Sequence, residues 1–192
     1  MKNLFSPKRV VIAVLALGVA SAGAWTFAQN MHAGGHNHGP GHMHDEANMP
    51  GLRGENATAE ESAEIATLFR DFETLTREVE NLPNGIKTLT HSSDQAVMDA
   101  LVSHSVGMID RVGQLDDPKI IIQSPTLDIF FLRGGTITSN VEVTDDGLLV
   151  IQTSEDPEMV AALHAHAAEV TAMAERGMAA VHDMMMERGT GH

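Results

Sequence analysis

Histidine and methionine, two metal-binding residue types, are concentrated in one short stretch near the start of the chain. Residues 31–49 contain five histidines and three methionines: His32, His36, His38, His42, His44, Met31, Met43 and Met49. Imidazole nitrogen is a borderline ligand and thioether sulfur a soft one, a mixture that suits copper in both oxidation states and also accommodates zinc or nickel through the histidines. We therefore predict a metal site, with copper favoured, at His32, His36, His38, His42, Met43 and His44.

The surrounding stretch is too poor in apolar residues to fold by itself. From residue 29 to residue 57 the chain is mainly Gly, His, Asn, Met and Pro, so burial cannot offset the entropy lost on ordering. We predict that residues 29–57 form a disordered metal-binding arm. Its composition resembles the His/Met-rich segments of bacterial periplasmic copper-handling proteins, a resemblance confined to the arm that implies copper sequestration or delivery. A solubilising spacer with incidental histidines is the plainer alternative.

The first residues have the pattern of an export signal. Lys2, Lys8 and Arg9 precede an unbroken run of apolar or small residues over 10–24, which is typical of a signal peptide. We predict cleavage after Ala28 and a periplasmic or otherwise exported protein. The apolar run is just long enough to span a bilayer, so membrane association follows only if the segment is uncleaved.

The rest of the chain contains an internal repeat at an offset of 62 residues. Aligning residues 69–104 with residues 131–166 gives eleven identical pairs in 36 positions, including Gly85 with Gly147, Asp94 with Asp156, and His104 with His166. A repeat of this kind indicates two copies of one structural unit. We predict a duplicated domain over residues 58–187, followed by a tail over 188–192.

The second copy shows the structure of the unit more clearly than the first. Residues 137–143 alternate with period two, Asp145-Asp146-Gly147 predicts a tight turn, and residues 148–153 return as a strand. Thr58, Ser124, Asp94 and Asp156 predict helix starts. The predicted fold is α+β: helix, β-hairpin, helix, twice, with a four-stranded antiparallel sheet and two long helices on one face.

Three residues of the predicted long helices could hold a cofactor. His104 and Met108 share an apolar stripe with Val97 and Val112, and His166 occupies the equivalent stripe of the second copy. We predict that His104 and His166 face each other, either as two structural histidines or as a shared metal or haem b site with Met108 as a further ligand. His164, two residues from His166, points away from it on a helix.

Met178, His182, Met185 and Met186 fall on one face of a C-terminal helix. Such a face could bind Cu(I), but methionines at this spacing more often pack in a core or a dimer interface, so we predict packing and leave a homodimer open.

Charge and composition exclude several functions. The formal charge is −14, and −17 without residues 1–28, so nucleic acid is a poor partner. Cysteine is absent, which excludes disulfides, thiolate sites and covalent c-type haem. The sequence shows no hydrolase triad, phosphate loop or dinucleotide fingerprint, and conventional enzyme chemistry is disfavoured. Three hypotheses follow: a copper-binding protein acting through the arm, a haem or metal protein acting at His104 and His166, and a non-enzymatic partner-binding domain.

Overall fold

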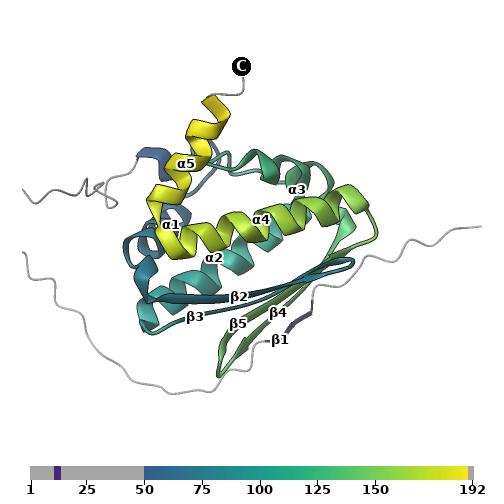
Figure 1. The fold of residues 1–192 in the computed structure, drawn as a ribbon, viewed down its shortest axis with the longest axis horizontal. Coiled ribbons are helices and arrows are strands. Elements are labelled where there is room, and N and C mark those ends of the chain that lie inside the picture. The colour runs from purple at the N-terminus through teal and green to yellow at the C-terminus, as the bar shows by residue number, and fades with distance from the viewer. Residues whose placement is uncertain (1–10, 14–49, 190–192) are drawn as a thin grey trace, which may run out of the picture.

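The computed structural model describes residues 11–13 and 50–189 (Figure 1). Its five α-helices are α1 (Ala59–Arg70), α2 (Gln95–Gln114), α3 (Asp128–Arg133), α4 (Pro157–Arg176) and α5 (Met178–Gly189). Its strands are β1 (Val11–Ala13), β2 (Leu75–Leu82), β3 (Gly85–Ser92), β4 (Ile137–Thr144) and β5 (Gly147–Ser154). Four 3-10 turns complete it: η2 (Pro50–Leu52), η3 (Phe72–Thr74), η4 (Pro125–Leu127) and η5 (Gly134–Thr136).

Four strands form an antiparallel sheet, and the predicted α+β class is confirmed. The order across the sheet is β1-β4-β5-β3-β2, so the second strand of each hairpin is central and the first is peripheral. The two hairpins join through β3 and β5, where Gly85 pairs with Thr153 and Thr90 with Leu148. Beyond the prediction, β1 pairs in parallel with the outer edge of β4.

The predicted helix starts are confirmed by their hydrogen bonds. The Thr58 hydroxyl accepts from the Glu61 amide at 3.1 Å and the Glu61 carboxylate accepts from the Thr58 amide at 2.7 Å, which is a complete capping box. Asp94 and Asp156 each accept a backbone amide at the start of α2 and α4. Each cap satisfies amides that the first helical turn would otherwise leave unpaired.

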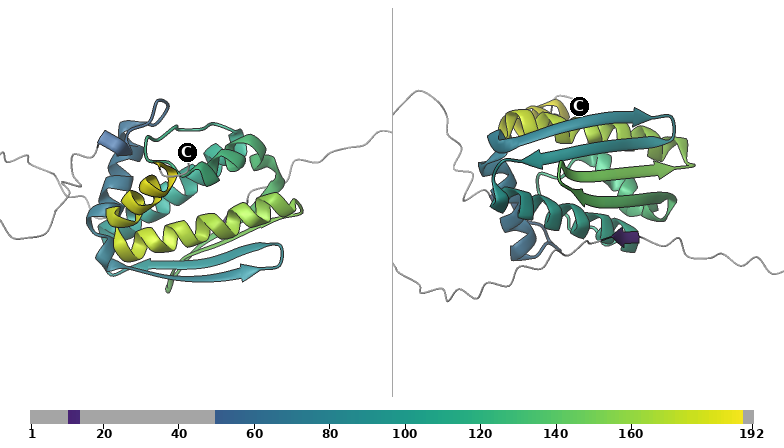
Figure 2. Two further views of the ribbon diagram at one scale, coloured as in Figure 1. Left: turned by 45° about the horizontal axis from the view of Figure 1, so that its top comes forward. Right: turned by 90° about the horizontal axis from the view of Figure 1, so that it is seen from below.

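The main core lies where the helices meet the sheet. α4 contacts β2, β3 and β5, and α2 contacts β3, β4 and β5, while Figure 2 shows how the helices lie along the sheet. Strand β3 alternates as a half-buried strand should, with Ile86, Thr88 and Thr90 buried. The buried apolar residues are Ile86, Val112, Phe130, Phe131, Met159, Leu163 and Ala167.

A second cluster joins the N-terminal side of the domain to its last helix. Leu52, Ile65, Phe69 and Val181 are buried together, with Met173, Met178 and Met184 packed against them. The segment around Leu52 also forms backbone hydrogen bonds with the loop before α3, from Ile121 to Arg53 and from Asn56 to Pro118. The packed part therefore includes residues 50–57, which the sequence analysis placed in the disordered arm, because Leu52 has a distant apolar partner in α5.

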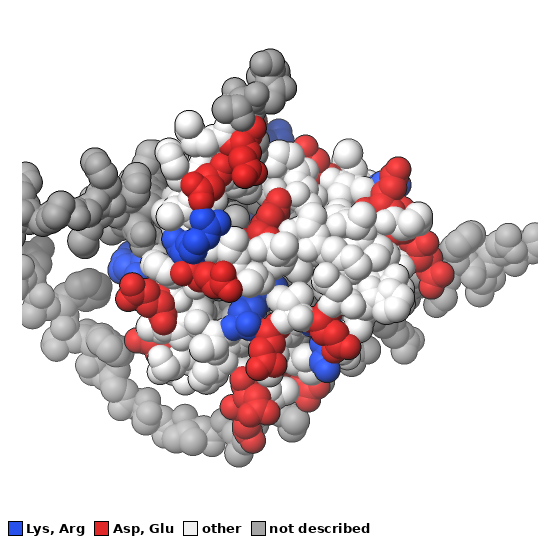
Figure 3. All heavy atoms as spheres, viewed as in Figure 1, with Lys and Arg blue, Asp and Glu red and all other residues white. Residues whose placement is uncertain are grey.

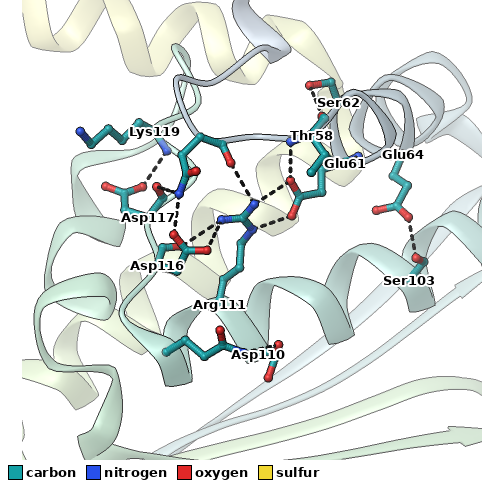
Figure 4. Close-up of polar contacts among 12 residues, drawn as sticks. Thr58, Glu61, Ser62, Glu64, Ser103, Asp110, Arg111, Asp116, Asp117 and Lys119 are labelled. Atoms are coloured by element: carbon teal, nitrogen blue, oxygen red, sulfur yellow. Dashed lines mark hydrogen bonds and ion pairs between the residues drawn. The ribbon is translucent and has the colours of Figure 1, made fainter.

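Arg111, near the end of α2, ties this N-terminal segment to the domain (Figure 4). Its guanidinium donates to both carboxylate oxygens of Glu61 at 2.6 and 3.0 Å, to the Asp116 carboxylate at 2.7 Å and to the Asn56 carbonyl at 2.9 Å. The Arg111 hydrogen bond is the main cause of a lowered pKa at Glu61. A planar guanidinium can serve these acceptors together, whereas an ammonium cannot.

We therefore expect Arg111→Lys to lower the free energy of unfolding by about 1–3 kcal/mol, because the Arg111 side chain is only 13% exposed and several acceptors lose their donor. Urea denaturation measures the change. Lys119→Gln is the matched control, since the Lys119–Glu55 pair is 57% and 77% exposed and should contribute at most about 1 kcal/mol. Equal losses in the two variants would mean that the Arg111 network does not hold this segment.

Charged side chains do not form one continuous acidic surface on the face in Figure 3, where red patches are separated and several adjoin blue ones. Lys87 pairs with Glu80 and Arg176 with Asp183. This face therefore does not single out one docking area for a cationic partner. Within the described residues, none of the helices is both long and apolar enough to cross a bilayer.

Candidate functional site

His104 of α2 and His166 of α4 lie within the apolar stripes predicted for the two long helices. In α2 the stripe is buried at Val97 and Val112, and in α4 at Met159 and Leu163. Both histidines keep part of their residue surface exposed, but the Nδ1 atom of each ring is enclosed. Periodicity thus placed both rings toward the interior, where an unpaired nitrogen is unfavourable.

His166 lies beside a carboxylate that the sequence analysis did not identify. Its Nδ1 is 3.6 Å from Oε2 of Glu169, one turn further along α4. The other oxygen of Glu169 accepts hydrogen bonds from the Ser124 and Thr126 hydroxyls, both at 2.7 Å. Phe130 meets the His166 ring edge-on, with centroids 5.4 Å apart. Glu169 is therefore fixed by the start of η4 while its second oxygen faces His166.

The charges in this region depend on one another. Burial lowers the pKa of His104 to about 4, the Glu61 carboxylate raises it, and His166 lowers it further. At Glu169 burial raises the pKa, but the adjacent His166 and the hydroxyls of Ser124 and Thr126 together lower it by more. A neutral His104 and an ionised Glu169 are the favoured forms at neutral pH.

Three donor atoms here are buried without a hydrogen-bond partner: Nδ1 of His104, Nδ1 of His166 and Oε2 of Glu169. Two imidazole nitrogens and a carboxylate oxygen suit zinc, nickel, Cu(II) or iron. Among the described residues, however, no three His, Asp or Glu side chains already converge as a metal site. A metal held by all three atoms would require a movement of at least one of these side chains.

The other predicted site residues lie apart or outside the structure. Met108 is half-buried one turn after His104. His164 instead donates from Nε2 at the β2–β3 turn, to the Leu82 carbonyl at 3.1 Å and to the Gly85 carbonyl at 2.8 Å. Two surface hollows, one along β2 and β3 and the other between β2 and α4, are not lined by His104, Met108 or His166. The predicted arm ligands His32, His36, His38, His42, Met43 and His44 lie outside the described residues.

The C-terminal methionines do not all pack. Met178 and Met184 adjoin the second cluster, but Met185 is 43% and Met186 57% exposed, and His182 is also exposed. Core packing within one chain therefore does not account for Met185 and Met186, and the predicted alternative, packing in a dimer interface, stays a prediction. The helix turns Ala180 and Val181 inward instead, and these are 5% and 1% exposed.

The chain therefore folds as a small α+β domain in which one long helix carries His104 and the other carries His166 beside Glu169. Comparison with known proteins found no family model that matches the chain, no similar curated protein and no similar solved structure.

Proposed function

We propose that this protein is an exported metal-binding protein that captures copper through its arm. One observation carries the proposal: five histidines and three methionines within residues 31–49 of a chain that has no cysteine. A flexible segment with this donor density can wrap an ion without a preformed cage. The basic and apolar residues at the start of the chain support export to the periplasm.

The folded domain supports this function because it holds the C-terminal end of the arm in place. Leu52, 3% exposed, lies three residues after Met49, the last methionine of the donor-rich stretch. Leu52 is buried against Val181, and Arg111 donates to the Asn56 carbonyl. These contacts fix the point at which the arm joins the domain. The arm would therefore sample copper near a defined part of the domain.

We also infer that the domain arose by internal duplication, with its two long helices on one face of the sheet. The order helix, 3-10 turn, hairpin, long helix occurs twice. Asp94 and Asp156, equivalent in the alignment, both cap the long helix of their half. Gly85 and Gly147, also equivalent, both begin a central strand. In this reading the interior histidines are equivalent residues of the two halves.

A second candidate function is a metal or haem b site at His104 and His166. Nδ1 of His104 favours it, because this buried atom has no hydrogen-bond partner, whereas buried polar atoms normally have one. Nδ1 of His166 and Oε2 of Glu169 also make no hydrogen bond and face each other at 3.6 Å. Glu169 would supply a third ligand to zinc, nickel or copper. Met108 and His104, four residues apart on one helix, point the same way, so they would not bind opposite faces of one haem.

Metal analysis of the purified full chain tests the proposal. We expect the wild type to retain Cu(II) at neutral pH and to release it as the imidazoles protonate near their usual pKa of about 6.5. Replacing the five arm histidines with asparagine should remove most of the copper.

His166→Leu is the matched variant in the domain and should leave copper binding by the arm unchanged. The opposite pattern, with copper lost from His166→Leu and kept by the arm variant, would favour the interior site. A Soret band in the purified protein would favour haem. Equal copper content in all the variants would contradict both proposals.

A further inference from the structure

Helix α5 has two distinct faces, and one of them presents metal-binding side chains to solvent. Ala180 and Val181 face the domain and are 5% and 1% exposed. His182, Met185 and Met186 lie on the exposed side. Because Met185 and Met186 are 43% and 57% exposed, their apolar surface is only partly removed from water. A surface position does not require methionine for stability.

The spacing of these three residues brings their donor atoms together. Met185 follows His182 by three residues and Met186 follows it by four, so the Cβ atom of each lies about 5–6 Å from that of His182. Met185 and Met186 are adjacent residues that lie on either side of His182, about 100° apart around the helix. Methionine has three rotatable side-chain bonds, which allow two neighbouring sulfurs to turn toward one ion. One imidazole nitrogen and two thioether sulfurs form a soft donor set, which selects Cu(I) over zinc, magnesium or calcium.

Helix α5 lies beside η2, which follows the histidine- and methionine-rich stretch in the chain. Leu52 of η2 packs in the same cluster as Val181 and Met184 of α5, and η2 lies next to α5 in Figure 1. His44 precedes Pro50 by six residues, a length of chain that spans at most roughly 20 Å. The histidine- and methionine-rich stretch therefore joins the domain beside α5.

We propose that His182, Met185 and Met186 form a Cu(I) site on the exposed side of α5, the helix that packs against Leu52 of η2. The identification of copper as the ion in the cell rests on the proposed function, whereas the preference for a soft monovalent ion rests on the donor set. The site differs from the one at His104, His166 and Glu169, which offers nitrogen and oxygen donors and no sulfur. It also differs from the arm, because a helix in the folded domain presents its ligands.

The test uses the full chain, Cu(I) under anaerobic conditions with a competing chelator, and methionines labelled at the methyl carbon. We expect the Met185 and Met186 methyl resonances to shift on addition of Cu(I). The variant with both Met185→Leu and Met186→Leu should bind Cu(I) at this site at least about tenfold more weakly, since even loss of an outer-shell partner weakens metal binding that much. Its melting temperature should be unchanged, because leucine conserves the volume.

The matched control changes Met178 and Met184 to leucine, two residues of the same helix that pack in the second cluster. It should keep the Cu(I) affinity of the wild type. A chain lacking the five arm histidines should still show the Met185 and Met186 shifts, which separates this site from the proposed function of the arm. Unshifted Met185 and Met186 resonances, or equal Cu(I) affinity in the wild type and the double variant, would overturn the proposal.

Discussion

Replacing Gly85 with alanine should lower the free energy of unfolding by about 3 kcal/mol, because the central strand pair has no space for a side chain at this position. A Cβ atom at Gly85 would lie 1.9 Å from the backbone carbonyl oxygen of Gln152. This contact lies between β3 and β5, the pair that joins the two hairpins. Relief requires the two strands to separate locally. Urea denaturation monitored by circular dichroism measures the loss.

Two further glycines make this prediction specific. Gly147, the equivalent of Gly85 in the second half, would place a Cβ 2.5 Å from the Thr90 carbonyl, so Gly147→Ala should also destabilise the protein. Gly107 in α2 has nothing within 4 Å, and Gly107→Ala should stabilise the helix by about 0.5–1 kcal/mol. If Gly85→Ala and Gly107→Ala changed stability in the same direction, the close β3–β5 pairing would be contradicted.

Local structure could be predicted from the sequence because its determinants are local. Thr58 with Glu61, and Asp156 with Pro157, lie within one helical turn of the amides that they cap. The turn at Asp145-Asp146-Gly147 is likewise set by adjacent residues. The first hairpin is less clear from its own sequence, because residues 60–80 taken alone could also form one long helix. Its assignment required the alignment with the second copy, and the structure confirms both strands.

The order of the strands could not be predicted in this way. The two hairpins could join through β3 and β5 or through β2 and β4. Which pair forms depends on which strand edges meet after both hairpins have formed. The alternation in each strand specifies a buried face but not a neighbour. The close backbone approach at Gly85 and Gly147 explains why glycine begins both central strands. Glycine is common after a turn, however, so these two residues do not by themselves predict that β3 pairs with β5.

The boundary of the arm was misplaced for a similar reason. Leu52 is an isolated aliphatic residue among glycine, asparagine and charged residues, and composition alone favours disorder for such a stretch. Its burial comes from Val181, which is 129 positions away in the chain. Helix periodicity, in the same way, predicted that Met178, His182, Met185 and Met186 share a face, but not which side of α5 meets the domain.

The sequence repeat identified the two interior histidines but not the carboxylate beside one of them. His104 and His166 stood out because they are shared by the two copies. Glu169 did not, because the equivalent residue of the first copy is Gly107. Glu169 follows His166 by three residues, a spacing that puts both on one helix face, and this was the signal that could have identified it. His166 therefore has Glu169 beside it on its own helix, whereas His104 has Gly107 at the equivalent position.

That asymmetry determines how the domain responds to acid. Burial lowers the pKa of His104 from 6.5 to about 4, despite the opposing influence of Glu61. The unfolded chain therefore binds a proton at this residue below about pH 6.5, whereas the folded chain stays neutral until about pH 4. The stability contributed by the neutral ring is fully present above pH 6.5 and is lost as the pH falls toward 4. Glu61 and Glu169, whose pKa values are lowered, add losses at more acidic pH.

We expect the free energy of unfolding of the metal-free protein to fall by about 3 kcal/mol between about pH 7 and about pH 4 because of His104 alone. His104→Leu should remove that part of the decline and leave the part due to the carboxylates. Urea denaturation of both proteins over this pH range, with a chelator present, measures the difference. His166→Leu is the matched control. It keeps His104 buried, so most of the decline in the free energy of unfolding should remain. The decline should be somewhat smaller than in the wild type, because His166 is one cause of the lowered His104 pKa. Parallel pH profiles for the wild type and His104→Leu would contradict this prediction. They would show that the folded protein accepts a proton on His104 as readily as the unfolded chain does.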